Sequence, residues 1–418
     1  MARSDPETAP KDPARAHALA LLRGVLEEGR SLGERGATPG EAARARRLAL
    51  SALRHRSRAE AALGPHLSRR PAAAVQALLV LAVAEMLAEG APAHAVVSDA
   101  VALARGLPGG GRVSGMVNAV LRRAAEGRAA WDAAAPPRMP GWLRGRVSGA
   151  FGGARTAAIE AAQEAGAPLD LTAARDAAGW ADRLGGTLLP TGSVRLPGGH
   201  VSQMAGHAEG AWWVQDAAAA LPARMVGARP GERVLDLCAA PGGKAMQLAA
   251  AGARVTALDA SEVRTQRLRE NLARTGLPAE VVVADALDWE AEPFDAVLLD
   301  APCSATGTIR RHPELPLIRG KEALAELAAI QDALIDRAVA LTRPGGRLVY
   351  AVCSLLPEEG ANRIASAMER HPGLVVEPAT LAGTEPGWWR DGALRTAPDL
   401  WADRGGMDGF FAVSLRRP

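Results

Sequence analysis

The 418-residue chain contains little cysteine, little lysine and few aromatic residues. Its three cysteines are widely spaced and form no C-x-x-C pair, which argues against a disulfide framework and against a zinc site, so we expect no bound metal. Its only lysines are Lys11, Lys244 and Lys321, and arginine therefore carries nearly all of the positive charge. The net charge is only +3, so charge alone is a weak argument for a nucleic-acid partner.

Long apolar runs are also missing. No stretch reaches the roughly 18 apolar residues that a membrane span needs, and the first residues lack the apolar core of a signal peptide. We therefore predict a cytoplasmic protein that does not enter the membrane. In a reducing compartment the three cysteines would be free thiols, which can take part in chemistry.

The length and a hydrophobic content of 48% predict a globular protein of two or three domains. Apolar residues recur three and four positions apart from about residue 14 to 128, which predicts an all-α domain over residues 1–135. Prolines between residues 132 and 140 indicate a linker. Residues 141–225 mix a helical stretch with short apolar segments, and we predict a small α+β connector there. Residues 226–418 are predicted to form an α/β domain.

Short β-rich runs alternate with helical stretches in this last domain. This alternation is typical of a parallel sheet in a doubly wound, Rossmann-like fold, whose ligands bind at the carboxyl ends of the strands. The predicted strands are Arg233–Cys238, Arg254–Asp259, Glu280–Asp285, Phe294–Asp300 and Gly346–Cys353, and the clearest helices are Ser261–Thr275 and Lys321–Leu341.

A glycine-rich turn, Cys238-Ala-Ala-Pro-Gly-Gly-Lys244, follows the first of these strands. Lys244 is followed by Ala245 and the first glycine of a P-loop is absent, so a phosphate cradle is excluded, and the dinucleotide fingerprint G-x-G-x-x-G is absent too. An adenosyl cofactor without phosphates remains, because acidic residues follow the next strands. Asp259 could bind ribose hydroxyls, Asp285 the adenine, and Asp300 the methionine end or the target base. Any one of them, taken alone, could equally be a helix cap or a turn residue.

Cysteines stand at two adjacent strand ends. Cys303 follows the fourth strand in Asp300-Ala-Pro-Cys-Ser, and Cys353 ends the fifth in Ala-Val-Cys-Ser. A thiolate that adds to carbon 6 of a cytosine makes carbon 5 nucleophilic, and a second positioned group helps to release the product. A lone cysteine is more often a small buried hydrophobe, but two at the ligand-binding edge favour catalysis. Spacing does not say which cysteine does which.

Four segments together resemble a known family: Val214–Asp216, Asp236–Lys244, Asp300–Glu314 and Tyr350–Ser354. The chain is similar to the Sun/Fmu family of RNA 5-cytosine methyltransferases, and most similar to the members that act on bacterial small-subunit (16S) ribosomal RNA. The resemblance implies that Cys353 attacks carbon 6 and that Cys303 assists release. It also implies S-adenosylmethionine as cofactor, with the following residues binding it: Cys238, Ala239, Ala240, Pro241, Gly242, Gly243, Lys244, Asp259, Asp285 and Asp300.

The helical N-terminal domain resembles the NusB-type RNA-binding domain, most closely at residues 115–123. Candidate phosphate contacts are Arg122, Arg123, Arg310 and Arg311, although each could be ordinary surface. The segment Gly405–Phe411 resembles the place where a last strand completes the family's sheet. We therefore expect a monomer that acts on ribosomal RNA. Two alternatives stay open: the same chemistry on transfer RNA, and a non-catalytic RNA-binding ribosome assembly factor.

Overall fold

The structure is a computed structural model that describes residues 11–32, 39–378 and 380–418. It divides into two compact units. The helical unit comprises Met1–Gly145, Gln163–Gly166 and Arg311–Gly320, and the α/β unit comprises Arg146–Ala162, Ala167–Arg310 and Lys321–Pro418.

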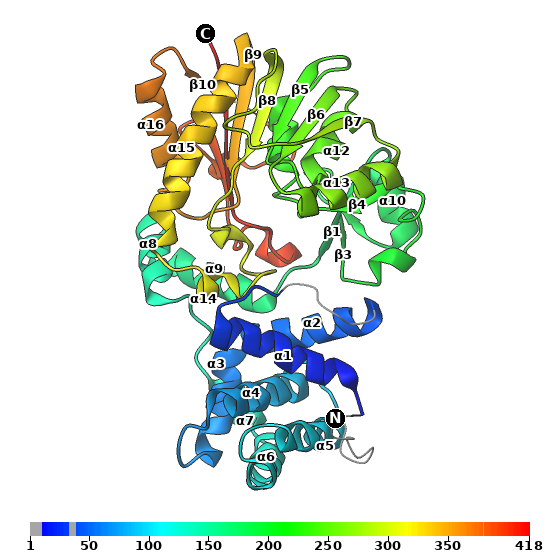
Figure 1. The fold of residues 1–418 in the computed structure, drawn as a ribbon, viewed down its shortest axis with the longest axis vertical. Helices are drawn as coiled ribbons and strands as arrows, with labels where there is room; N and C mark the ends of the chain where they lie inside the picture. Colours follow the sequence, from blue (N-terminus) through cyan, green and yellow to red (C-terminus); the bar gives the residue numbers. More distant parts are fainter. Residues whose placement is uncertain (1–10, 33–38, 379) are drawn as a thin grey trace. The chain divides into compact units, whose positions relative to one another are not determined.

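The helical unit is built around α4 (Ala73–Leu87), which contacts α1, α2, α3, α5 and α6 (Figure 1). Eleven of its 15 residues are buried, because its sequence is apolar on every side and suits only a central helix. No helix in the described residues is long and apolar enough to cross a membrane. This unit confirms the all-α prediction. Its other helices are α1 (Pro13–Glu28), α2 (Pro39–Arg54), α3 (Arg56–Leu63), α5 (Ala93–Arg105), α6 (Gly110–Ala124), α7 (Arg128–Ala133) and α14 (Leu315–Ile318).

A small sheet with the strand order β2-β3-β1-β4 precedes the large one. Its strands are antiparallel wherever they pair. A buried ion pair ties it to the chain that follows: Arg195 holds both oxygens of Asp170 at 2.7 Å, and Asp170 also accepts the N–H of Ala217. The elements are α8 (Gly141–Phe151), α9 (Gly153–Ala165), β1 (Leu169–Ala173), α10 (Ala177–Leu184), β2 (Thr187–Leu188), β3 (Val194–Leu196) and β4 (Trp212–Val214).

The large sheet has the strand order β11-β12-β13-β9-β8-β5-β6-β7, and β10 also pairs with β13. The five strands from β9 to β7 are parallel, as predicted. The strands are β5 (Arg233–Leu237), β6 (Arg254–Asp259), β7 (Ala279–Val283), β8 (Phe294–Asp300), β9 (Thr342–Val352), β10 (Val375–Glu377), β11 (Trp389–Arg390), β12 (Ala393–Thr396) and β13 (Phe410–Arg416). The helices between them are α11 (Leu221–Val226), α12 (Gly243–Ala250), α13 (Glu262–Thr275), α15 (Ala323–Leu341) and α16 (Ala361–Arg370).

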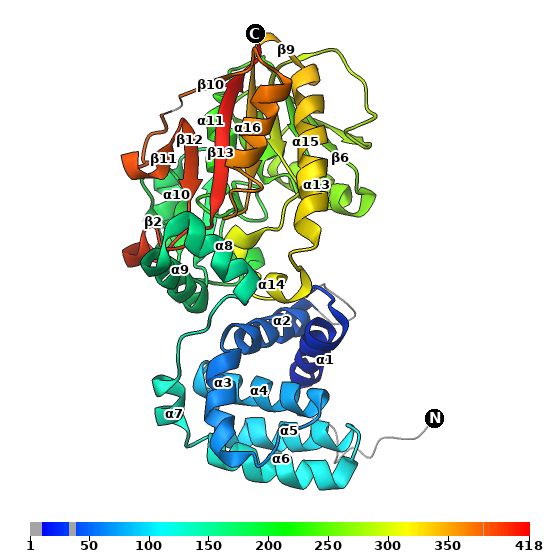
Figure 2. The same cartoon turned by 90° about the vertical axis from the view of Figure 1, so that its left-hand side faces the viewer.

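Beyond β9 the sheet is antiparallel, in strands that the five predicted parallel strands did not include. Strand β13 runs antiparallel to β9 and to β12, and Figure 2 shows β12 and β13 side by side. The last strand therefore lies inside the sheet rather than at its edge. Strands β10, β11 and β12 have two to four residues each, too few for an alternating pattern to stand out in the sequence.

Helices cover both faces of this sheet. Alternate residues of a strand point to opposite faces, so Val234 and Leu298 pack in one apolar cluster with α11, α12 and α13. Leu235 and Leu299 pack in the other with α15 and α16. Figure 1 shows α15 and α16 on one side and α12 and α13 on the other. Burial on both faces explains why the central strands are continuous apolar runs.

A buried ion cluster ties distant segments of the α/β unit together. Arg310, which is fully buried, donates to Asp216 at 2.5 Å, to Asp408 at 2.8 Å and to the carbonyl of Gly405. Asp216 also accepts the N–H of Asp408. The prediction that Arg310 contacts phosphate is therefore wrong, because two carboxylates and a carbonyl already occupy a guanidinium that no solvent reaches. The prediction for Arg311 stays untested.

Replacing Arg310 with Met should lower the free energy of unfolding by about 3–5 kcal/mol, because two buried carboxylates would lose their counter-charge. Urea denaturation measures this. Arg343→Met is the matched control, since Arg343 pairs with Asp295 while its side chain is 52% exposed. That change should cost less than about 1 kcal/mol. Equal losses in the two variants would contradict a special role for the buried cluster.

Candidate active site and cofactor loop

The glycine-rich turn connects β5 to α12, and we call residues Cys238–Gly242 the cofactor loop. Its first and last residues have positive φ angles, 60° at Cys238 and 105° at Gly242. A Cβ atom at Gly242 would lie 2.3 Å from a methyl carbon of Leu268 on α13. Glycine is therefore required at this position both for the backbone angle and for the close approach of α13.

Asp259, at the end of β6, is hydrogen-bonded to the cofactor loop. Its carboxylate is buried and accepts the N–H groups of Ala240 at 3.1 Å and Ser261 at 3.0 Å. Arg264 donates to both of its oxygens, at 2.7 and 2.9 Å. Asp259, the residue predicted to bind the ribose, thus lies beside the loop. Its hydrogen bonds also fix the backbone at Ala240 and Ser261.

Asp236, the fourth residue of β5, is the one carboxyl group among the described residues whose two oxygens are both buried without a hydrogen-bond partner. It is fully buried, and neither carboxylate oxygen has a hydrogen-bond partner among the described residues. The N–H of Ala245 favours its charged form without meeting hydrogen-bond geometry. Burial raises the pKa of Asp236 to about 8, with Lys244 opposing and Asp300 and Asp259 adding to the rise. A buried carboxyl group left without a partner marks a place where another group is expected.

Lys244, in the first turn of α12, points its ammonium group at Asp300, with Nζ and Oδ2 2.7 Å apart. The same ammonium lies 5.4 Å from the ring centre of Phe410. Burial lowers the pKa of Lys244. The negative charges of Asp300, Asp236 and Cys353 raise it by more than burial lowers it, so the pKa lies above its usual value. The lysine therefore stays charged beside Asp300 and Asp236, and Cys353 adds to the electrostatic effect.

Asp285 lies at the outer edge of this group. It is exposed, and its carboxylate accepts the N–H of Leu287 at 3.0 Å. The structure thus shows the turn-capping role that was left open for this residue, and it leaves the rest of the carboxylate exposed for a ligand. Among the described residues no three His, Cys, Asp or Glu side chains gather as metal ligands would.

The two predicted catalytic cysteines meet. The sulfur atoms of Cys303 and Cys353 are 3.5 Å apart, with Cys303 buried and Cys353 partly exposed. The hydrogen bond with Cys353, and then burial, raise the pKa of Cys303 well above that of an ordinary thiol. Cys238 is different, because burial raises its pKa to about 12 and its nearest charges are carboxylates. Cys238, the first residue of the cofactor loop, therefore stays a protonated thiol.

The structure therefore gathers most of the predicted residues at one edge of the parallel strands. The sequence reasoning gave no role to Asp236 or Phe410. Asp236 had a visible signal, since it is the strand residue that begins the motif Asp-Leu-Cys-Ala-Ala-Pro-Gly-Gly-Lys. Phe410 had none, because nothing in its own segment shows that it approaches Lys244.

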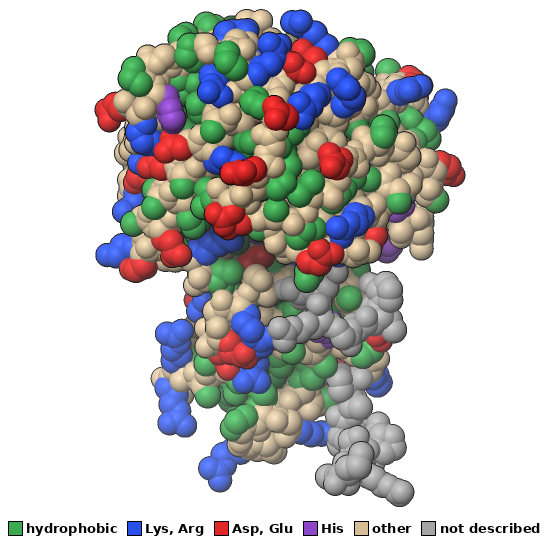
Figure 3. All heavy atoms as spheres, turned by 45° about the horizontal axis from the view of Figure 1, so that its top comes forward, with side chains coloured by type: hydrophobic (Ala, Val, Ile, Leu, Met, Phe, Trp, Pro, Cys, Tyr) green, Lys and Arg blue, Asp and Glu red, His purple; other side chains and the backbone are tan. Residues whose placement is uncertain are grey.

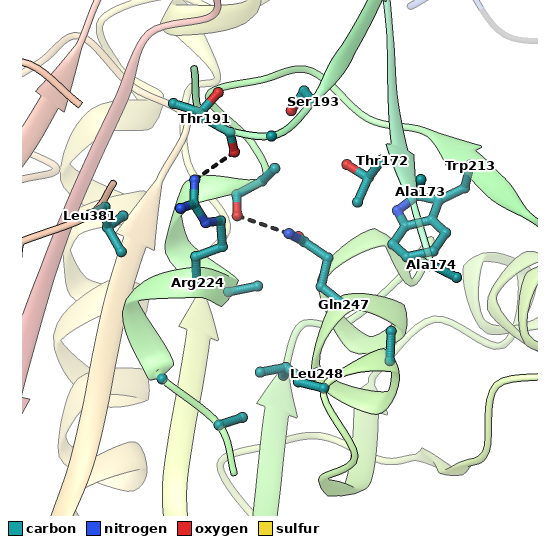
Figure 4. Close-up of a pocket in the computed structure, with 17 residues that line it drawn as sticks. Thr172, Ala173, Ala174, Thr191, Ser193, Trp213, Arg224, Gln247, Leu248 and Leu381 are labelled. Carbon is teal, nitrogen blue, oxygen red and sulfur yellow. Dashed lines mark hydrogen bonds between the residues drawn. The ribbon is translucent and has the colours of Figure 1, made fainter. Parts of the chain in front are cut away.

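A separate pocket of about 540 Å³ lies elsewhere in the α/β unit (Figure 4). Its lining includes Thr172, Thr191, Arg224 and Gln247. Arg224 donates to the carbonyl of Thr191 at 2.6 Å and forms part of the pocket wall. None of the predicted site residues lines this pocket, so it is distinct from the site at the strand ends.

The surface offers no simple electrostatic guide to the site. On the face of the α/β unit that Figure 3 shows, Lys and Arg side chains are interspersed with Asp and Glu. Many of the arginines form ion pairs, such as Arg416 with Glu377 and Arg370 with Asp336. The functional argument for this unit therefore rests on the buried strand ends rather than on surface charge.

Comparison with known proteins agrees with this geometry. Residues 223–416 match the family model described as 16S rRNA methyltransferase RsmB/F, and residues 12–126 match the NusB family. The ribosomal RNA small subunit methyltransferase B of Pseudomonas syringae pv. tomato is 36% identical, over 82% of this chain and 81% of that protein. The protein of the same name from Vibrio vulnificus is 33% identical, over 96% and 98%. The crystal structure of the protein PH0851 covers 100% of both chains with a TM-score of 0.74 at 22% identity, which shows the fold alone. The chain belongs to the RsmB/F family of 16S rRNA methyltransferases.

Proposed function

We propose that this protein uses S-adenosylmethionine to methylate carbon 5 of a cytosine in 16S ribosomal RNA, through a covalent bond between a cysteine and the base. The observation that carries the proposal is the pair of thiols 3.5 Å apart at the ends of β8 and β9, beside the cofactor loop. We also propose the domain division 1–135, 141–225 and 226–418, with the first domain recruiting RNA.

The residues around the loop fit this cofactor. S-adenosylmethionine carries a cationic sulfonium and an ammonium group. Asp236, Asp259 and Asp300 lie by the loop; Arg264 pairs with Asp259 and Lys244 with Asp300, which leaves Asp236 without an ion pair among the described residues. Asp236 lacks a hydrogen-bond partner among the described residues, and a cationic ligand would satisfy it. Asp259 would hold the ribose and Asp285 the adenine.

Bound S-adenosylmethionine supplies an electrophilic methyl group. The Cys353 thiolate would add to carbon 6 of the cytosine, and the electron pair displaced to carbon 5 would form the new bond to the methyl group. The bond between that methyl group and the cofactor's sulfur would break, with S-adenosylhomocysteine as the leaving group. The proton of carbon 5 would then pass to water, the double bond between carbons 5 and 6 would re-form, and the electrons of the sulfur–carbon bond would return to Cys353. Cys303 would assist this release. Asp300, oriented by Lys244, would hydrogen-bond the base.

Replacing Cys303 with Ala should trap a covalent complex between protein and RNA, because the adduct on Cys353 would form but would not be released. Replacing Cys353 with Ala should abolish both the complex and 5-methylcytosine. The assay uses labelled S-adenosylmethionine and unmethylated 16S RNA, with nucleoside analysis and denaturing gels.

A complex that forms in Cys353→Ala but not in Cys303→Ala would reverse the two roles. Product on transfer RNA alone would keep the chemistry and overturn the substrate. No product on either RNA, with the cofactor still bound, would favour a ribosome assembly factor.

The affinity for S-adenosylmethionine should rise with pH. Burial raises the pKa of Asp236 to about 8, so this group is mostly protonated at neutral pH. A bound cation lowers that pKa, so binding should release a proton and strengthen as pH rises, by at most about tenfold per pH unit below the pKa of the free protein. Titration calorimetry in two buffers at about pH 6.5 and about pH 8.5 measures both effects. The variant Asp236→Asn should show neither, and an equal pH dependence in both proteins would contradict this assignment.

A groove of about 650 Å³ in the helical unit supports RNA as the partner. It lies along α5 and α6, and its lining includes Lys11, His94, Arg105 and Arg122. Within the described residues, none of these three Lys and Arg side chains pairs with a carboxylate. The acidic residue of the groove, Asp99, is buried and neutralised by Arg15 at 2.6 Å. Unpaired cations along a groove suit the phosphates of RNA.

The double change Arg105→Ala and Arg122→Ala should weaken RNA binding and flatten its salt dependence. Loss of two phosphate contacts should reduce the slope of log K against log salt by about 1.4–1.8. Binding titrations at several salt concentrations measure this. The control, Arg23→Ala with Arg128→Ala, removes the same charge from the same unit, but both of these arginines already pair with acids. Equal slopes in the two double variants would rule out the groove as the phosphate site.

A further inference from the structure

A fully buried carboxylate stands behind the two cysteines. Glu359 lies in the turn before α16 and has no exposed surface. Its backbone carbonyl accepts the hydroxyl of Tyr350 at 2.6 Å, which fixes the turn against β9. Both oxygens of its side chain accept hydrogen bonds, and the donors come from the two loops that carry the cysteines and from α15.

On the first loop, Glu359 binds the residue that follows Cys303. Its Oε1 accepts the N–H of Ser304 at 2.7 Å, and its Oε2 accepts the Ser304 hydroxyl. Gln331 on α15 donates to Oε1 at 3.3 Å and to the carbonyl of Pro302 at 2.9 Å. Ser304, after Cys303, therefore bonds to Glu359 directly, and Pro302, before Cys303, bonds to Gln331, which itself bonds to Glu359.

On the second loop, Glu359 binds the residue that follows Cys353. Its Oε2 accepts the hydroxyl of Ser354 at 2.5 Å. Thr306, from the first loop, lies 3.1 Å from the same hydroxyl and accepts the N–H of Leu355. One carboxylate oxygen thus joins the serine after Cys303 to the serine after Cys353.

We propose that Glu359 is a positioning residue that holds Cys303 and Cys353 at their reactive separation. It does not reach the sulfur atoms itself, but it fixes the backbone next to each of them. A carboxylate suits this task because it only accepts hydrogen bonds, and every group directed at it is a donor. The distance of 3.5 Å between the two sulfur atoms is a feature of the structure. Its importance for catalysis rests on the proposed function.

The test replaces Glu359 with Gln. With its NH₂ group at the position of Oε1, the amide opposes the N–H of Ser304. With its NH₂ group at the position of Oε2, it keeps both serines only if their hydroxyls turn round to accept, which ends their donation to that atom. Either orientation weakens the link between the two loops. We expect kcat for RNA methylation to fall about 10- to 100-fold, the effect of misplacing a reacting group by about 1 Å, while KM for RNA and the affinity for S-adenosylmethionine stay nearly unchanged. Dibromobimane, which fluoresces only when it bridges two nearby thiols, reports the separation directly. Its reaction across Cys303 and Cys353, identified by peptide mass, should fall in the same variant.

The matched control is Glu358→Gln. Glu358 is adjacent, its side chain is 39% exposed, and it pairs with Arg146 rather than with either cysteine loop. It should leave kcat and thiol bridging unchanged. If Glu359→Gln does not fold, Ser304→Ala and Ser354→Ala each remove one hydroxyl donor and should lower bridging by smaller amounts.

Three results would overturn the proposal: a folded Glu359→Gln protein with normal bridging, serine variants that bridge like the wild type, or a Glu358→Gln variant with the same losses. Failure of the proposed function looks different. In that case the wild type makes no methylated RNA, and bridging still depends on Glu359.

Discussion

The parallel pairing of β8 with β9 is the constraint on which the active site depends. Asp300 lies opposite Ala351 in this pair, so the loops that leave the two strands start side by side. Main-chain hydrogen bonds continue the pairing beyond the strands, from Ala301 to Ala351 and from Gly307 to Cys353. A cysteine three residues after Asp300 and another two residues after Ala351 must then meet, although 50 residues separate them in the chain.

The buried polar groups around this pair divide into two kinds. Arg310 and Glu359 are fully buried, and each has its charge or its oxygens matched by partners from distant segments. Such groups cost little once every partner is in place, and they fix the loops that carry them. Asp236 is buried without a hydrogen-bond partner in the described part of the chain. Both of its oxygens lack a partner among the described residues, and this is why the proposed function places the cationic part of the cofactor beside it.

The parts of the fold that could be predicted have a local signal. Apolar runs gave the five parallel strands, helical periodicity gave the N-terminal unit, and residues at strand ends gave the cysteines and most of the acidic site residues. The parts that could not be predicted depend on contacts between distant segments. Nothing near Arg310 in the sequence shows that Asp216 and Asp408 will enclose it, and so an arginine expected to bind phosphate became part of the core. The serines after Cys303 and Cys353 were visible, but their shared partner Glu359 appears only when both loops are folded.

Lysine is rare in this chain, and one of its few lysines lies at the predicted site. Arginine supplies nearly all the basic residues of this chain, and only three lysines are present. One of them, Lys244, lies in the first turn of α12, just after the cofactor loop, and its ammonium group is near Asp300 and the ring of Phe410. A compact ammonium group directs one charge at one carboxylate oxygen, whereas a planar guanidinium suits a forked set of acceptors. Arg310, by contrast, is enclosed in the core by two carboxylates and a carbonyl. The single charge of Lys244 faces Asp300, which in the proposed mechanism also hydrogen-bonds the base.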